Sequence, residues 1–218
     1  MRLVFLLLLL FAACFAAEGV KASDANDGWK LATEQNGVTI YSRSHPGSSL
    51  KEFKALGEIA APSRAVCQVI EDVDNYTNFM PYMAECKLLK RDTDSLLSYQ
   101  RISPKICGDR DFTLRTYRTS WSTGAGIAYS NRWESANALG PAKKPGVVRV
   151  PVCQGSWLLE PTAADRTRAT YSVYTDTGGL VPPFIANHFS LTGIRDIFAA
   201  VRKQVQEPKY NGQRATGP

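Results

Sequence analysis

Two histidines, His45 and His188, are the only imidazoles in this chain of 218 residues. A serine or cysteine nucleophile needs such a base within hydrogen-bond distance. His45 lies in a Ser-His-Pro-Gly segment, which is typical of an exposed loop. His188 falls on the apolar stripe of an expected helix, where it contacts either the core or the polar group of a ligand. With so few bases available, we expect no enzymatic activity.

The spacing of the cysteines does not suggest a metal site. Zinc takes three or four protein ligands, yet the sequence has two distant histidines and no Cys-x-x-Cys pair. A glycine-rich phosphate loop ending in Gly-Lys-Ser/Thr is also missing. We therefore expect no metal and no other cofactor. Beyond Cys14, the sequence leaves open whether any disulfide joins the remaining cysteines, which are Cys67, Cys86, Cys107 and Cys153.

The N-terminal segment has the pattern of an export signal. Met1-Arg2 precedes an apolar run from Leu3 to Ala13, which is shorter than the roughly 20 residues that cross a bilayer. We expect residues 1–22 to be a signal peptide and the protein to be periplasmic or secreted. The alternative is a lipoprotein, because Phe11-Ala12-Ala13-Cys14 approximates a bacterial lipobox with Cys14 as the lipidated residue.

The rest of the chain predicts a strand-rich domain that ends in a long helix. Apolar and polar residues alternate in a series of segments separated by turn residues, which favours an antiparallel meander. These segments are residues 38–43, 53–60, 86–91, 95–102, 110–121, 127–134, 147–160 and 168–176. A first helix is expected after Pro62. A long amphipathic helix is expected from Phe184 to Val205, where apolar residues recur every three to four positions, followed by a disordered tail over residues 207–218.

Composition and charge limit the classes of binding partner that we expect. A chain with 44% hydrophobic and 21% charged residues is typical of a globular protein. Its net charge of +6 comes from scattered lysines and arginines, without the basic runs and interleaved aromatics of a nucleic-acid binder. Together with export, this makes nucleic acid an unexpected partner. We expect a monomer whose positive charge favours transient contact with anionic lipid surfaces.

Several motifs, in order, resemble the START lipid-transfer domain family. The segments that carry the resemblance over about residues 28–206 are Trp29 with Gly37-Val38-Thr39-Ile40-Tyr41, Phe53-Lys54-Ala55-Leu56-Gly57, Pro104 with Arg110-Asp111-Phe112, Gly155-Ser156-Trp157-Leu158-Leu159-Glu160-Pro161, and Asp176-Thr177-Gly178-Gly179-Leu180-Val181-Pro182. The resemblance implies an α+β helix-grip fold, in which a curved antiparallel sheet is closed by the C-terminal helix around a hydrophobic cavity. It also implies binding of one lipid.

The resemblance does not carry a sterol-binding acid–arginine pair to this chain. The arginine of that pair falls on Thr116 here, and the acid falls near Leu97. Arg110 and Asp111 are expected to be a structural pair or a turn anchor. Arg118 either binds a phosphate or carboxylate group of a ligand or extends into solvent.

Strand alternation and the helix stripe predict which side chains bind the ligand. Trp157 is expected either to line the cavity or to pack in the core, and Asn131 to supply a polar contact in an apolar wall. The predicted ligand-binding residues are Phe112, Leu114, Thr116, Arg118, Tyr129, Asn131, Trp133, Cys153, Trp157, Phe184, His188, Leu191 and Phe198.

The sequence predicts a lipid-binding protein of the cell envelope that opens through movement of the loop at residues 120–126, with Trp121 inserting into a membrane. Two alternatives remain. One is a helix-grip enzyme of the polyketide cyclase or aromatase type. The other is an envelope interaction protein whose interior is filled by its own side chains.

Overall fold

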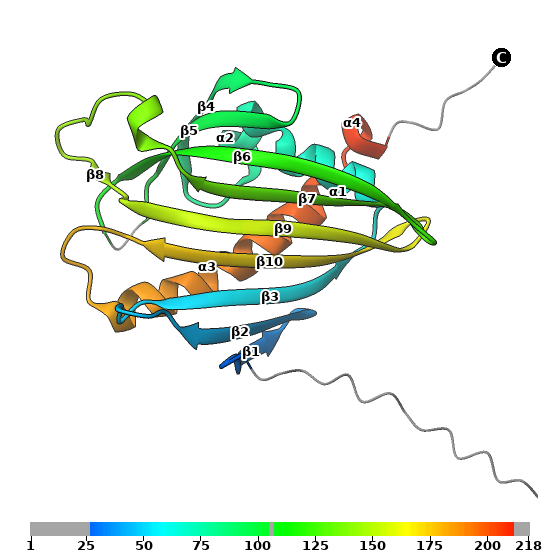
Figure 1. Ribbon diagram of the computed structural model, residues 1–218, viewed down its shortest axis with the longest axis horizontal. Coiled ribbons are helices and arrows are strands. Elements are labelled where there is room, and N and C mark those ends of the chain that lie inside the picture. The colour runs from blue at the N-terminus through cyan, green and yellow to red at the C-terminus, as the bar shows by residue number, and fades with distance from the viewer. Residues whose placement is uncertain (1–26, 105–106, 212–218) are drawn as a thin grey trace, which may run out of the picture.

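The computed structural model describes residues 27–104 and 107–211, and these form a curved sheet with helices on its concave side (Figure 1). The main path of the sheet is antiparallel, in the order β1-β2-β3-β10-β9-β7-β6-β5-β4. These strands are β1 (Lys30–Gln35), β2 (Val38–Ser44), β3 (Lys51–Ile59), β10 (Arg166–Asp176), β9 (Val152–Ala163), β7 (Gly126–Ser135), β6 (Arg110–Thr123), β5 (Ser95–Ile102) and β4 (Met83–Arg91).

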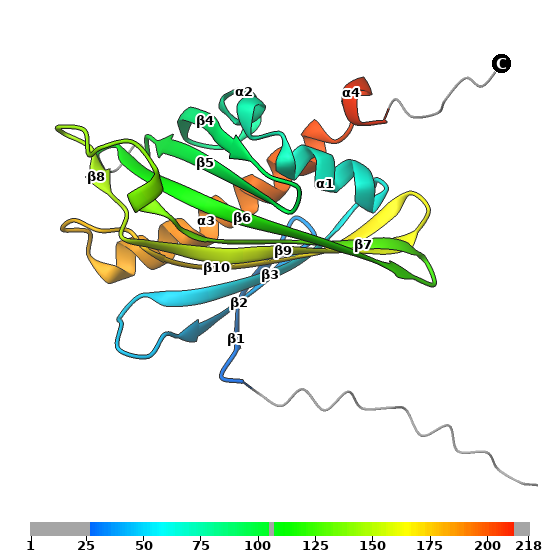
Figure 2. The ribbon, with the colours of Figure 1, turned by 45° about the horizontal axis from the view of Figure 1, so that its top comes forward.

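The helices cover the concave side of the sheet (Figure 2). They are α1 (Ser63–Glu71), α2 (Tyr76–Phe79), α3 (Pro183–Gln204) and α4 (Pro208–Asn211), with the 3-10 turns η1 (Val73–Asn75) and η2 (Asn137–Leu139). α3 packs on β2 and β3, whereas α1 packs on β7 and β9 and also contacts α3. The predicted helix-grip fold is thereby confirmed. Among the described residues, no helix combines the length and the hydropathy of a membrane span.

The C-terminal half of α3 is tightly joined to the sheet. Phe198 is fully buried, and its ring centroid lies 5.1 Å from that of Trp157. This close approach needs Gly57 on β3, because a Cβ there would lie 2.8 Å from the Phe198 ring. Arg202 donates hydrogen bonds to the carbonyls of Asn36 and Gly37 at 2.7 and 2.8 Å and of Glu58 at 3.0 Å. Helix and sheet are therefore joined by both apolar packing and backbone contacts.

The strand predicted at residues 147–160 is divided at Pro151. The short β8 (Val148–Arg149) pairs with β6 in parallel, and β9 begins at Val152. Proline has no N–H to donate to a ladder, which accounts for the interruption. Arg149 is then placed against Asp111 of β6, with Nε and Oδ1 at 2.6 Å.

Asp111 is a structural residue, as predicted, but Arg110 is not its partner. Besides Arg149, the buried Asp111 carboxylate accepts a hydrogen bond from the Tyr99 hydroxyl at 3.1 Å. Arg110 instead donates to the carbonyls of Gly108 and Thr177, at 2.6 and 3.2 Å. It thus anchors the turn before β6 to the segment before α3.

The C-terminal boundary differs from the prediction. Residues 208–211 form α4, and the buried Tyr210 hydroxyl donates to Asp72 at 2.6 Å, so the ordered chain continues beyond residue 206. The predicted disorder therefore does not apply to α4. The predicted signal peptide, the lipidation of Cys14 and the last part of the tail lie outside the described residues.

The ion pairs of Glu85 predict that part of the free energy of unfolding depends on pH. Hydrogen bonds from Lys87, then Lys144 and Arg101, lower the pKa of Glu85 to about 2. Because this folded-state pKa lies below the ordinary 4.5, the contribution is present above that value and is lost as the pH falls toward 2. Glu85→Gln should lower the free energy of unfolding by about 1 kcal/mol at neutral pH.

The measurement is urea unfolding at pH 7 and pH 3, since the difference between the two proteins should shrink at the lower pH. A difference that is equal at both values would contradict this role of Glu85.

A cavity between the sheet and the helices

A cavity of about 540 Å³ lies between the concave face of the sheet and the helices. Its wall is mostly aliphatic and aromatic. The residues of β5 to β10 in the wall are Leu96, Gln100, Ile102, Arg110, Phe112, Leu114, Thr116, Asn131, Trp133, Cys153, Trp157, Tyr171, Val173 and Thr175. The sheet therefore supplies a continuous wall from β5 to β10.

Most of the predicted strand residues line this cavity. They are Phe112, Leu114, Thr116, Asn131, Trp133, Cys153 and Trp157. The pairing of Asn131 with Trp157 across β7 and β9 shows why they share a face, since residues opposite each other in an antiparallel pair point the same way. Trp133 extends over Gly155, where a Cβ would lie 2.5 Å from the indole. A larger residue at 155 would displace this part of the wall.

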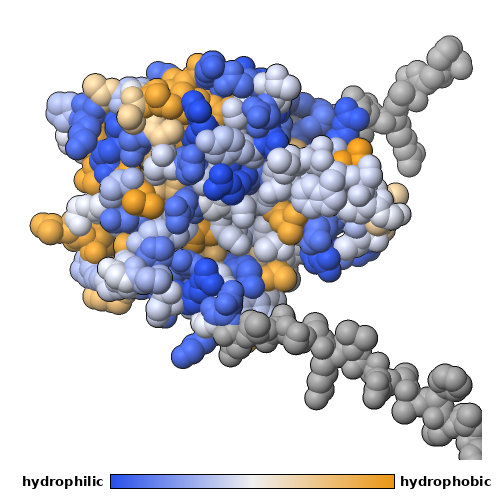
Figure 3. Space-filling model, in the orientation of Figure 1, coloured by the Kyte–Doolittle hydropathy of each residue, from blue (hydrophilic) through white to orange (hydrophobic). Residues whose placement is uncertain are grey.

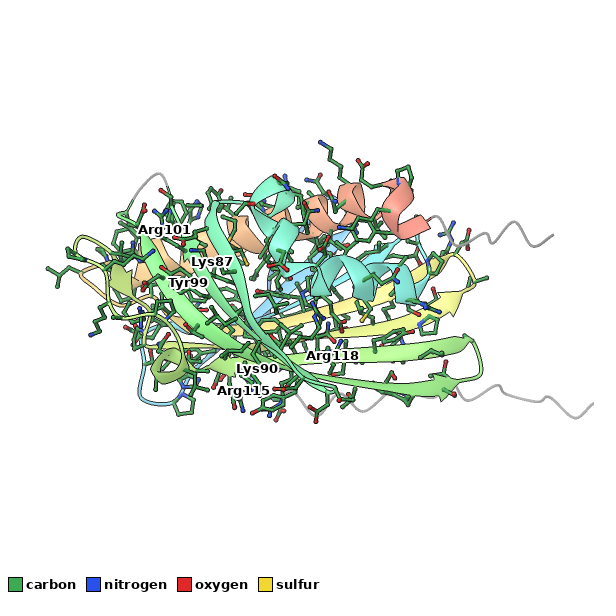
Figure 4. The ribbon with its side chains drawn as sticks, turned by 90° about the horizontal axis from the view of Figure 1, so that it is seen from above. Lys87, Lys90, Tyr99, Arg101, Arg115 and Arg118 are labelled. Atoms are coloured by element: carbon green, nitrogen blue, oxygen red, sulfur yellow. The ribbon has the colours of Figure 1, made fainter. Side chains whose placement is uncertain are left out.

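Two predicted strand residues do not line the cavity. Tyr129 lies beside a separate groove between the start of α1 and the strand hairpins. Arg118 neither extends freely into solvent nor lines the wall, because its Nη1 donates to Glu71 at the end of α1 at 2.9 Å. Figure 4 shows Arg118 on β6 beside α1. The sequence did not suggest this partner, since the two residues are far apart along the chain.

The predicted stripe of α3 is not its cavity face. Phe184 is 74% exposed and His188 is also exposed, while Leu191 and Phe198 pack on the core. The helix residues that line the cavity are Ala186, Phe189, Ser190, Gly193, Ile194 and Ile197. The predicted stripe combines the sheet-packing face of the C-terminal half of α3 with the outer face of its first turns. The four predicted ligand contacts on this stripe therefore do not line the cavity.

Sequence reasoning also missed a part of the wall between α1 and β4. Ile70, Val73, Tyr76, Met80 and Met83 line the cavity there. The available signal was the crowding of aromatic residues and methionines over residues 76–83, which is unusual for an irregular segment. A polar surface loop would not contain such a cluster.

Loops form one end of the cavity. The lining there includes Pro81, Tyr82, Pro104, Cys107 and Val181. Figures 1 and 2 show the start of α3 at this end and the β6–β7 hairpin at the other. The hairpin that the sequence predicts to open the cavity lies away from these loops, and β6 and β7 are paired to its tip at Thr123 and Gly126.

Burial keeps one thiol and two hydroxyls of the wall uncharged. Desolvation raises the pKa of the Cys153 thiol and of the Tyr76 and Tyr171 hydroxyls. The four described cysteines are all free thiols. No cluster of three or more His, Cys, Asp or Glu side chains in residues 27–104 and 107–211 is arranged to hold a metal. The arrangement is suited to enclosing an apolar molecule.

The comparisons with known proteins agree with this geometry. The family described as polyketide cyclase / dehydrase and lipid transport matches residues 59–202. An uncharacterised protein of Pseudomonas aeruginosa is 30% identical over 190 residues, covering 87% of this chain and 91% of the relative. The phosphatidylcholine transfer protein of Mus musculus is 24% identical over 206 residues, covering 89% and 95%.

A solved structure extends the similarity to three dimensions. The STAR-related lipid transfer protein from Xanthomonas axonopodis, a fragment of residues 25–204, has a TM-score of 0.74 and 29% identity, covering 83% of this chain and 100% of the fragment. The sheet, the closing helix and the matched length all coincide with the START-like arrangement. The chain belongs to the polyketide cyclase / dehydrase and lipid transport family, as a START-like member.

Proposed function

We propose that this protein holds one lipid or similar hydrophobic molecule in its cavity and carries or shields it in the cell envelope. The observation that carries the proposal is an apolar cavity of about 540 Å³, large enough for a small ligand. Apolar surface transferred from water into such a wall contributes roughly 25 cal/mol per Å². Similarity to lipid transfer proteins supports the same ligand class.

The proposal includes no catalysis. Among the described residues of the wall, Glu71 is the one carboxylate, and it is already paired with Arg118. His45 does not line the cavity, and its Nδ1 lies 2.6 Å from Glu52. His188 is exposed on the outer side of α3. These positions favour a binding role over the cyclase alternative.

Native mass spectrometry of the purified protein tests the binding proposal. We expect a co-purified hydrophobic molecule at one per chain, released by denaturation and identified by its mass. A protein that carries nothing, and that takes up nothing from lipid vesicles, would contradict the proposal. That result would favour an interaction protein instead.

Export is the second part of the proposal and rests on the N-terminal segment. Mass spectrometry of the N-terminus from an envelope fraction should give a chain beginning near Ser23. A chain beginning at a lipidated Cys14 would instead establish the lipoprotein alternative. Finding the intact N-terminus only in the cytoplasm would contradict export.

Membrane contact is proposed at the loop end of the cavity. Leu180 is fully exposed and Phe184 is 74% exposed, both beside the start of α3. Figure 3 shows hydrophobic surface at this end and hydrophilic residues over much of the remaining view. Apolar side chains that protrude beside the loops of a lipid cavity can enter a bilayer surface and bring the loops to it.

The double change Leu180→Ser and Phe184→Ser should weaken binding to anionic vesicles at least tenfold, because each apolar side chain contributes about 1.5–3 kcal/mol on burial. Vesicle co-sedimentation measures this. Trp121→Ser is the matched control, since Trp121 is 44% exposed near the β6–β7 hairpin, and this hairpin lies at the opposite end (Figure 1). If Trp121→Ser caused the larger loss, the membrane would bind at the hairpin instead.

A further inference from the structure

The turn that links α2 to β4 holds Tyr82 in an unfavourable backbone conformation. The turn runs from Met80 to Met83 and is closed by a backbone hydrogen bond from Met83 N to Met80 O at 3.4 Å. Tyr82 has a φ of 60°. A positive φ directly after Pro81 is the pattern of a type II turn, in which glycine is favoured at this position. A tyrosine is strained there, because its Cβ crowds the backbone.

This strain is unusual within the part of the chain that the structure describes. Among residues 27–104 and 107–211, the one other non-glycine residue with a positive φ is Asn36. Asn36 precedes Gly37 in the hairpin turn between β1 and β2, where this conformation is ordinary. Tyr82 has no such local reason. Strained residues persist only where their surroundings hold them, and they gather at functional sites.

Two hydrogen bonds hold Tyr82 in this conformation. Its hydroxyl donates to Oδ2 of Asp196 on α3 at 2.9 Å, and its carbonyl accepts from the backbone N–H of Ser103, after β5, at 2.8 Å. Tyr82 lines the loop end of the cavity and is also 39% exposed. Its side chain therefore lies between the cavity and the solvent and joins the loops to α3.

The two sides of this contact are not equally fixed. Asp196 belongs to the half of α3 that Phe198 and Arg202 hold to the sheet. The turn of Tyr82 follows α2, which has only four residues. If the hydroxyl leaves Asp196, the turn is therefore the part that moves, and the strain of its backbone is released.

We propose that Tyr82 is a latch that closes the loop end of the cavity, and that the strain of its turn favours release of the latch. The hydrogen bond to Asp196 stabilises the closed state, and the positive φ destabilises it. The latch then sets the rate at which a ligand enters and leaves, whereas the apolar wall sets the affinity. This inference rests on the proposed binding function.

The test follows the release of parinaric acid, a fluorescent fatty acid, from loaded protein into an excess of phosphatidylcholine vesicles. Energy transfer from Trp133 and Trp157, which line the cavity, reports the bound probe. Asp196→Ala removes the acceptor of the latch without changing a residue of the wall. Release should be about fivefold faster. The Kd should stay the same, because the latch is shared by the empty and the loaded protein and both rates rise together.

Tyr82→Phe keeps the ring and removes the hydroxyl, so it should also accelerate release about fivefold. Combining it with Asp196→Ala should give no further acceleration, because both changes break the same bond. Tyr117→Phe is the matched control. The Tyr117 hydroxyl also donates to a carboxylate, that of Glu134 at 3.0 Å, but Tyr117 does not line the cavity. Its release rate should equal that of the unchanged protein.

A second pair of variants tests the strain by itself. Tyr82→Ala and Tyr82→Gly both lack the ring and the hydroxyl, and they differ in the freedom of the backbone. Glycine adopts a positive φ readily and alanine does not. The closed turn should therefore be less populated in Tyr82→Ala, which should release the probe several-fold faster than Tyr82→Gly.

The outcomes separate the latch from the proposed function. Unchanged release rates in Asp196→Ala and Tyr82→Phe overturn the latch while the binding function stands. Equal acceleration in Tyr117→Phe, or equal rates in Tyr82→Ala and Tyr82→Gly, also overturn the inference. An unchanged protein that binds no parinaric acid would count against the binding function itself.

Discussion

Replacing Gly193 by tryptophan should abolish ligand loading without unfolding the protein. Gly193 lines the cavity in the middle of α3, and a Cβ placed there has no atom within 4 Å. A side chain added at this position therefore extends into empty space. An indole occupies a large part of the volume that a ligand would use, so we expect a loss of at least tenfold in the lipid recovered per chain.

Two controls accompany this variant. Gly193→Ala should load normally and should raise the stability by about 1 kcal/mol, since alanine is the better helix former. Ala199→Trp adds the same indole to an exposed position of the same helix and should load normally. Full loading of Gly193→Trp, measured by native mass spectrometry, would show that the ligand does not occupy this cavity.

Phe198→Ala should destabilise the protein by about 3–5 kcal/mol. The Phe198 side chain is fully buried against Trp157 and the backbone of Gly57, so its removal leaves a cavity in the joint between α3 and the sheet. Urea unfolding measures the change as a shift of the midpoint at constant slope.

Phe184→Ala is the matched control for this loss, because it removes the same side chain from the same helix at an exposed position. It should change the stability by less than about 0.5 kcal/mol. Similar losses in both variants would mean that α3 is not held to the sheet through Phe198.

The strands and the position of the closing helix could be predicted because they depend on local patterns. The alternation in β6 placed Phe112, Leu114 and Thr116 on one face, and the structure has all three in the cavity wall. The pairing register then places residues of the neighbouring strands on the same face. A two-residue period leaves few choices of face.

The face of α3 could not be predicted by the same means. A helix has apolar residues on more than one side when it packs on a sheet and also borders a cavity, and periodicity alone does not separate the two sides. Phe198 meets the sheet, whereas Phe189 meets the cavity. Leu180 and Phe184, which are apolar and exposed, were indistinguishable from core residues in the sequence.

Side-chain pairs between distant segments also could not be predicted from the sequence. The partner of Arg118 is Glu71 on a helix, and the partner of Asp111 is Arg149 beyond a long loop. Each pair depends on how two elements come together, which a single sequence does not record.

The two halves of α3 are attached to the sheet unequally and should differ in local stability. The half that contains Phe198 and Arg202 is held by buried rings and by hydrogen bonds to three backbone carbonyls. In the first turns, Phe184 and His188 are exposed, and the hydrogen bonds to the sheet are those of Asn187 with the backbone of Ser49 and Lys51. Free energies of local opening follow such differences in burial. We therefore expect the first turns of α3 to open locally while its C-terminal half stays packed on the sheet. The free energy of this opening should be a small fraction of the free energy of unfolding the whole domain.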